Sequence, residues 1–141
     1  LVFAGSGAMK KTLATFAQTH HIENKVTFLG NIAHSQLPAW LSNAKVLCLP
    51  SYNEGVPNVV LESMAAGTPV LATCVGGIPE VVDESICGKL IPPKDAKAVA
   101  KGLSELLTRQ WSREKIQQHG SQFTWQKNKK LLIEMLNANS R

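Results

Sequence analysis

The segment 46-VLCLPSYNEGVPNVVLESMAAGTPVLAT-73 contains the clearest indications of fold class in this chain. It opens and closes with short apolar runs, Val46–Leu49 and Pro69–Thr73, each of strand length. Between them, a loop leads into Asn58–Ala66, which has helical periodicity, and Gly67 follows at the position where helices commonly end. Strands that are apolar at every position are typical of a parallel sheet covered on both faces. The stretch therefore predicts a strand–helix–strand unit of an α/β fold.

The same alternation of strands and helices extends along the rest of the chain. We expect further strands at Leu1–Ala4, Val26–Leu29 and Leu90-Ile91, and further helices at Met9–His20 and Ser35–Asn43. From about residue 94 the pattern is helical only, over roughly 95–108, 111–118 and 125–138. The pattern predicts a single domain over residues 1–141, with a helical C-terminal extension from about residue 94.

Composition and charge exclude several classes of protein. The 141 residues are 44% hydrophobic, which is enough for a core, and no apolar run approaches the about 20 residues that a membrane helix needs. The cysteines Cys48, Cys74 and Cys87 lack metal-ligand spacing, so we expect reduced packing residues in a cytosolic protein. Residues 1–93 carry a net charge of −1 and residues 94–141 carry +6. Because no aromatic residues alternate with these lysines, we expect solvated helix faces and no nucleic-acid partner.

The stretch that follows the strand at Val46–Leu49 carries the candidate chemistry. Glu54 lies in the loop after the strand, where α/β folds bind ligands, and Glu62 lies about one helical turn into the next helix. Asn58 is a candidate N-cap, and free N–H groups at that helix start would attract phosphate. Carboxylates and an anion site together suit a ligand with hydroxyls and phosphate. Two solvated glutamates near a helix start would have the same spacing, so the spacing alone leaves both interpretations open.

The wider pattern resembles the C-terminal domain of the two-domain, double-Rossmann (GT-B) glycosyltransferases. It is similar to the large retaining family in which seven residues separate two glutamates, here Glu54 and Glu62. The other matching segments cover nearly the whole chain: Gly5–Gly7, Phe28–Gly30, Pro50-Ser51, Gly55, Pro57, Met64–Val70, Gly76–Glu80, Gly88–Pro93 and Phe123–Trp125.

The resemblance implies a Rossmann-like parallel sheet with helices on both faces, the C-terminal half of a GT-B enzyme. It implies the donor-binding domain of a retaining glycosyltransferase that moves a sugar from a nucleotide-diphosphate sugar to a glycan or lipid-linked acceptor, as in polysaccharide biosynthesis. The nucleotide sugar is the co-substrate, and we expect no cofactor and no metal ion. Asp83 and Asp95 are the only aspartates, so the chain has no Asp-x-Asp motif for a metal.

The resemblance also implies a role for each matching residue of the site. Glu54, the candidate catalytic residue, would hold hydroxyls of the transferred sugar, and Glu62 would bind the ribose hydroxyls. The backbone of Gly55, Val56, Pro57 and Asn58 would contact the sugar and the diphosphate. Asn31 and Ile32, in the loop after Phe28–Gly30, would lie against the base.

The chain departs from the family pattern at its start. The family's first strand, with a following arginine and lysine that grip the diphosphate, has no counterpart, nor does the acceptor-binding domain. We therefore expect a fragment that is inactive alone, or alternatively a non-catalytic module that binds nucleotide sugars or other proteins. In the family order the missing strand lies between Leu1–Ala4 and Val46–Leu49. These strands would close up, an upstream segment would lie between them, or another chain would donate a strand in an exchanged oligomer.

The resembling enzymes work at the cytoplasmic face of membranes in many cases, and their last helix returns toward the acceptor domain. Lys127, Lys129 and Lys130 are therefore candidates for contact with anionic lipid, in a cytoplasmic protein that is peripheral to the membrane. A solvated helix is the alternative interpretation.

Overall fold

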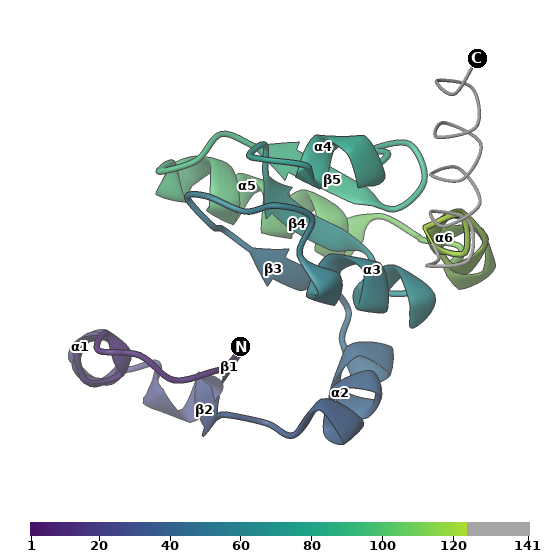
Figure 1. The fold of residues 1–141 in the computed structure, drawn as a ribbon. Helices are drawn as coiled ribbons and strands as arrows, with labels where there is room; N and C mark the ends of the chain where they lie inside the picture. Colours follow the sequence, from purple (N-terminus) through teal and green to yellow (C-terminus); the bar gives the residue numbers. More distant parts are fainter. Residues whose placement is uncertain (124–141) are drawn as a thin grey trace, which may run out of the picture. The chain divides into compact units, whose positions relative to one another are not determined.

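The computed structural model describes residues 1–123 and has the predicted α/β architecture (Figure 1). The helix expected at 125–138, and with it Lys127, Lys129 and Lys130, lies outside the described residues. The chain divides into two compact units, Leu1–Leu37 and Pro38–Arg141.

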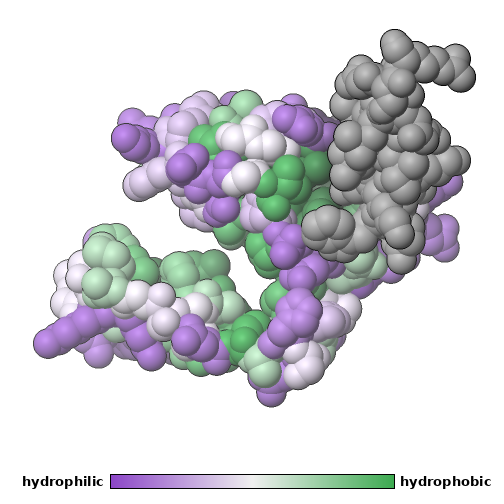
Figure 2. Space-filling model, viewed as in Figure 1, coloured by the Kyte–Doolittle hydropathy of each residue, from purple (hydrophilic) through white to green (hydrophobic). Residues whose placement is uncertain are grey.

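The first unit is built on a two-stranded parallel sheet, in which β1 pairs with β2. Its elements are β1 (Val2–Ala4), α1 (Lys10–Thr19), β2 (Thr27–Gly30) and two short 3₁₀ turns at Glu23–Lys25 and His34–Gln36. Phe3 and Phe28 lie opposite one another across the sheet, and their rings stack with centroids 5.1 Å apart. Hydrophobic residues, green in Figure 2, lie on the surface of this unit. Leu1 is 68% exposed and Phe16 is 57% exposed.

The second unit is a three-stranded parallel sheet with strand order β3-β4-β5 and helices on both faces (Figure 1). Its strands are β3 (Leu47–Leu49), β4 (Val70–Thr73) and β5 (Gly88–Ile91). Its helices are α3 (Asn58–Ala65), α4 (Ile78–Val81), α5 (Ala96–Thr108) and α6 (Arg113–Gly120), and α2 (Leu37–Asn43) starts at the boundary between the units.

Strand β4 supplies the core on both faces of this sheet, because successive side chains of a strand point in opposite directions. Val70 and Ala72 are buried in a cluster with Met64 of α3 and Ile116 of α6. Leu71 points to the other face, where it packs with residues of α5 and β5. All four residues of β4 are buried, whereas β3 is only half-buried along its length. Full burial on both faces is thus a property of the central strand.

One expectation from the sequence stays a prediction, and another needs correction. Within residues 1–123, β1 pairs with β2 and β3 pairs with β4, in two separate sheets, and the three arrangements expected around the missing strand stay predictions. Cys74 is exposed just after β4 ends, so the packing role expected for it is wrong.

The N-cap expected for the helix that starts at Asn58 also changes. Pro57, not Asn58, is the N-cap of α3: its extended backbone (φ −71°, ψ 129°) places Asn58 inside the first turn. After Cys74 the chain forms the short helix α4, which the sequence did not predict and whose first residue, Ile78, is fully buried in the core.

Met64 is completely buried against α6, where a Cβ at Gly120 would lie 2.9 Å from the Met64 Cβ. Because the helices are too close to collapse further, Met64→Ala leaves a cavity, and we expect a loss of about 2 to 5 kcal/mol in the free energy of unfolding. Urea denaturation measures the loss. Leu107→Ala removes an apolar side chain that is 52% exposed and serves as the matched control, with an expected change of less than about 0.5 kcal/mol.

Candidate functional site

The candidate site lies at the carboxyl edge of the second unit's sheet. In a parallel sheet all carboxyl ends meet at one edge, so the loops that follow β3, β4 and β5 converge there. These loops are residues 50–57, 74–77 and 92–95. The first carries Glu54 and leads directly into α3, which carries Glu62.

Two hydroxyl groups hold the 50–57 loop against the sheet. The hydroxyl of Thr73, at the buried end of β4, donates to the Ser51 carbonyl oxygen at 2.6 Å. The Ser51 hydroxyl then donates to Oε1 of Glu54 at 2.7 Å. Hydrogen bonds to ionised groups are short and strong, so Ser51 fixes the direction of the Glu54 carboxylate. The second carboxylate oxygen is left for a ligand, because an ionised carboxylate accepts several hydrogen bonds.

The glycine pair at Gly76 and Gly77 packs directly onto the same loop. The Gly77 N–H donates to the Gly55 carbonyl oxygen at 2.9 Å. Gly76 has φ +55°, and a Cβ on it would lie 1.8 Å from the carbonyl oxygen of Glu54. Only a residue without a side chain fits there, in both conformation and space. The loop that carries Glu54 is therefore held by β4 on one side and by the glycine turn on the other.

Helix α3 brings the second glutamate to the site. Its first turn starts at Asn58, which is exposed, and the first N–H groups of a helix have no acceptor within the helix. Together with the positive end of the helix dipole, they favour a bound anion. Glu62 follows in the second turn and is half-buried. This edge can thus accept hydrogen bonds from ligand hydroxyls at two carboxylates and donate to an anion at the helix start.

The structure brings together six of the predicted site residues and leaves two in the other unit. Glu54, Gly55, Val56, Pro57, Asn58 and Glu62 lie in one loop–helix segment of the second unit. Asn31 and Ile32 follow β2 in the first unit, where Asn31 is exposed and Ile32 half-buried. Sequence reasoning assigned no role to Ser51 and Thr73, although both precede turn residues at strand ends, where short hydroxyl side chains commonly bond to loop backbone.

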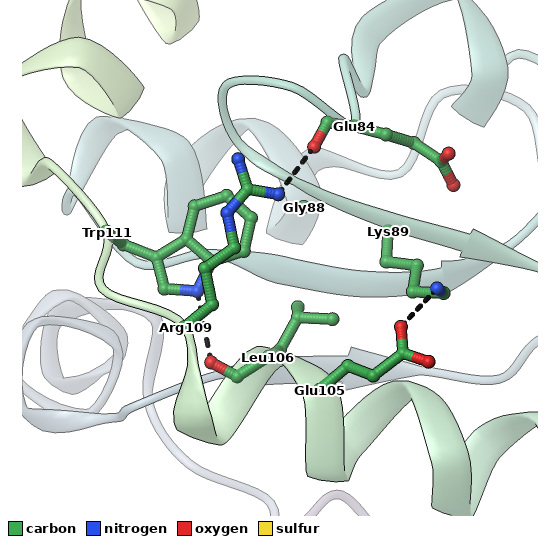
Figure 3. Close-up of a pocket in the computed structure, with 7 residues that line it drawn as sticks. All are labelled: Glu84, Gly88, Lys89, Glu105, Leu106, Arg109 and Trp111. Atoms are coloured by element: carbon green, nitrogen blue, oxygen red, sulfur yellow. Dashed lines mark hydrogen bonds and ion pairs between the residues drawn. The ribbon is translucent and has the colours of Figure 1, made fainter.

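Two hollows of the second unit lie at the opposite, amino edge of the sheet. One, of about 130 Å³, lies beside the start of β5 (Figure 3). Its polar groups bind one another: Lys89 pairs with Glu105, and Arg109 donates to the carbonyl oxygens of Glu84 and Ser85 at 3.1 and 2.7 Å. The other, of about 310 Å³, shares Arg109 and Trp111 with it, and there the Arg109 guanidinium lies 4.0 Å from the indole centroid. We interpret both hollows as structural, because their cations hold helix ends and loop carbonyls.

Within residues 1–123, no three His, Cys, Asp or Glu side chains are grouped so that they could hold a metal ion. In the same part of the chain, no helix combines the length and the hydrophobicity that crossing a membrane requires. Burial raises the pKa of the Cys48 and Cys87 thiols, which fits packing residues.

The chain is similar to a known protein family and to curated proteins of about three times its length or more. The family described as "Glycosyl transferases group 1" matches residues 1–123. A D-inositol 3-phosphate glycosyltransferase of Salinispora tropica is 34% identical over 137 residues, which are 94% of this chain and 28% of that protein. The chain spans less than a third of the length of the curated relatives that it matches.

Two solved structures show the same fold. The C-terminal domain of a group 1 glycosyl transferase (LpcC) from Francisella tularensis is 30% identical, with a TM-score of 0.68 over 79% of this chain and 58% of that chain. HepE of Anabaena, solved in complex with UDP and glucose, has a TM-score of 0.77 over 97% of this chain and 40% of that chain, at 24% identity. At that identity the second likeness shows the fold alone, which is that of the C-terminal half of GT-B proteins.

Gly76→Ala tests how the glycine turn supports the site. The new Cβ would overlap the Glu54 carbonyl oxygen, so either the turn or the 50–57 loop has to move, and we expect a loss of about 2 to 4 kcal/mol in the free energy of unfolding. Chemical denaturation measures it. Gly55→Ala is the matched control, because a Cβ at Gly55 meets nothing within 4 Å. An equal loss in both variants would contradict the close packing of Gly76 against the Glu54 carbonyl oxygen.

Glu105 makes stability depend on pH. Its hydrogen bond to Lys89 lowers the pKa of Glu105 in the folded chain. The pair therefore stabilises the fold above the pKa of an unfolded glutamate, and that stabilisation is lost as the pH falls through the lower, folded value. We expect Glu105→Gln to have a shallower fall in melting temperature in acid than the unsubstituted chain. Lys89→Met should flatten the profile likewise, and the double variant should add nothing further.

Proposed function

The chain belongs to the glycosyl transferases group 1 family, and from this membership we propose that it is the nucleotide-sugar-binding part of a retaining glycosyltransferase. The observation that carries the proposal is the anchoring of Glu54. Ser51, Thr73 and the glycine turn hold its loop beside the start of α3. A carboxylate held in one direction next to a helix N-terminus suits a ligand that presents sugar hydroxyls and phosphate together.

The roles follow the order of groups in such a ligand. Glu54 accepts hydrogen bonds from hydroxyls of the transferred sugar, and Glu62, further along α3, accepts those of the ribose. The backbone N–H groups of Gly55, Val56 and Asn58 donate to the diphosphate, and Pro57, which has no N–H, contacts the ligand without donating. The assignment of Asn31 and Ile32 to the nucleobase rests on the family resemblance alone. HepE, which shares the fold, is known in complex with UDP and glucose, and this supports a nucleotide sugar as the ligand.

In the proposed reaction, the bond between the anomeric carbon and the diphosphate oxygen breaks, and the acceptor hydroxyl attacks from the same face of the sugar. The departing phosphate oxygen takes the proton of that hydroxyl. No residue of the chain is needed as a nucleophile. The contribution of the protein is to stabilise the charge that develops on the diphosphate, which oriented N–H groups and a helix dipole do well. We propose that no cofactor or metal ion takes part, and that the protein acts in the cytoplasm on a glycan or lipid-linked acceptor.

The division of labour between the two glutamates can be tested by titration calorimetry with UDP, GDP and ADP and with the corresponding glucose donors. Glu62→Ala loses the ribose contacts, so we expect binding of the nucleoside diphosphate itself to weaken by about 1 to 3 kcal/mol. Glu54→Ala should leave nucleoside diphosphate binding unchanged and weaken only the intact sugar donor.

Glu114→Ala is the control for loss of a carboxylate, since Glu114 is exposed on α6 and has no part in the proposed site. It should bind both kinds of ligand as the unsubstituted chain does. Equal effects of the Glu54 and Glu62 variants on nucleoside diphosphate binding would refute the assignment of the two roles.

A further inference from the structure

Lys94 stands in a backbone conformation that does not suit it. It lies in the loop between β5 and α5, and its φ is +61°. A left-handed conformation is costly for a residue with a side chain and costs glycine almost nothing. Residues in such a conformation cluster at functional sites, where the surrounding structure holds them in place and the strained geometry serves the function.

The charge of Lys94 is also in an unfavourable place. Asp95, the next residue, is the N-cap of α5, and its carboxylate accepts from the Ala98 N–H at 2.9 Å. The N-terminus of a helix carries partial positive charge, so a cation beside it is repelled. Within residues 1–123, the Lys94 ammonium group makes no ion pair that would offset this repulsion. Local structure therefore disfavours this residue in two independent ways.

What holds the side chain in place is an aromatic ring of the candidate site. The Lys94 ammonium nitrogen lies 5.6 Å from the centroid of the Tyr52 ring, within the range of a cation–π contact. Tyr52 stands two residues before Glu54 in the anchored loop and is 70% exposed. The contact therefore joins the loops after β3 and β5 and brings a positive charge to the loop that carries Glu54.

The positive charge of Lys94 would attract the negatively charged phosphates of the proposed ligand. Among the three loops at this edge, residues 50–57, 74–77 and 92–95, Lys94 is the sole basic residue. Glu54 and Glu62 make the nearby protein surface negative, whereas a nucleoside diphosphate is itself an anion. A cation held over an exposed ring, together with the positive end of α3, would compensate that repulsion.

We infer that Lys94, positioned by Tyr52, binds a phosphoryl group of the substrate at this edge of the sheet. The inference rests on the proposed function and adds to it a ligand-binding residue outside the Glu54–Glu62 segment. The phosphoryl group can belong to the donor's diphosphate or to a phosphate carried by the acceptor. Tyr52 acts as a positioning residue, because its ring orients the ammonium group.

The test measures the affinity of the 141-residue chain for UDP, GDP and ADP, for the corresponding nucleosides, for inorganic pyrophosphate and for glucose 6-phosphate. With Lys94→Ala, we expect the affinity for the phosphorylated probes to fall about tenfold, as for loss of one charge-assisted contact, and that for the nucleosides to stay unchanged. Lys94→Arg should restore binding to within about threefold, and raising the salt concentration should reduce the difference between the Lys and Ala forms.

A second variant separates binding from folding. Lys94→Gly removes the charge and also relieves the left-handed backbone, so its melting temperature should rise by about a few degrees while its affinity falls as in the alanine variant. Tyr52→Phe keeps the ring and should keep the affinity, whereas Tyr52→Ala should lose part of it. A residue with only a structural role would change the melting temperature and leave every affinity unchanged.

The outcomes show whether the phosphoryl group belongs to the donor or to the acceptor. They also separate the inference about Lys94 from the nucleotide-sugar proposal. A Lys94-dependent loss for nucleoside diphosphates assigns the group to the donor, and a loss confined to glucose 6-phosphate assigns it to the acceptor. If only pyrophosphate binding depends on Lys94 and no nucleotide binds, the inference stands and the nucleotide-sugar proposal fails. If no phosphorylated probe binds the Lys94 form more tightly than the alanine form, the inference is wrong, whatever happens to the proposed function.

Discussion

Strand β4 is buried on both faces of the sheet in the second unit. Val70 and Ala72 pack against α3 and α6, and Leu71 packs toward α5, so one strand of four residues joins both cores. Because β4 also pairs with β3 and β5, its position sets the edge at which the three following loops meet. Thr73, the last residue of the strand, is buried as well. Its hydroxyl group donates to the Ser51 carbonyl oxygen and so fixes the loop of Glu54 to the strand.

The site combines a rigid part and a strained part, and the two have different physical origins. The Glu54 loop is held by contacts that also stabilise the fold, namely the Thr73 hydroxyl and the close approach of Gly76. Lys94 contributes nothing comparable to stability, since its backbone and its charge are both unfavourable where they stand. Such a difference is common at binding sites, where some residues serve the fold and others serve the ligand at a cost to the fold.

Much of the fold could be predicted because local signals agree with tertiary structure along most of the chain. The short apolar runs became strands within about one or two residues of the expected ends, and Gly67 adopts φ +74° directly after α3 and its C-cap, as a helix-ending glycine should. The errors arise where local and tertiary preferences differ. Asn58 is a good N-cap residue, yet Pro57 caps α3 and Asn58 lies in its first turn, and Cys74 follows a buried strand but is itself exposed.

Periodicity, turn residues and motif spacing are local properties, so the amino-acid sequence was enough to predict the α/β class, the parallel strands and the segment that carries Glu54 and Glu62. The pairing of the strands, the hydrogen bonds of Ser51 and Thr73 that direct the Glu54 carboxylate, and the contact of Lys94 with Tyr52, 42 residues before it in the chain, became visible only in the folded molecule. These features join residues that are distant in sequence or depend on the direction of a side chain. Such geometry exists only once the strands have been brought side by side and their loops share one edge of the sheet.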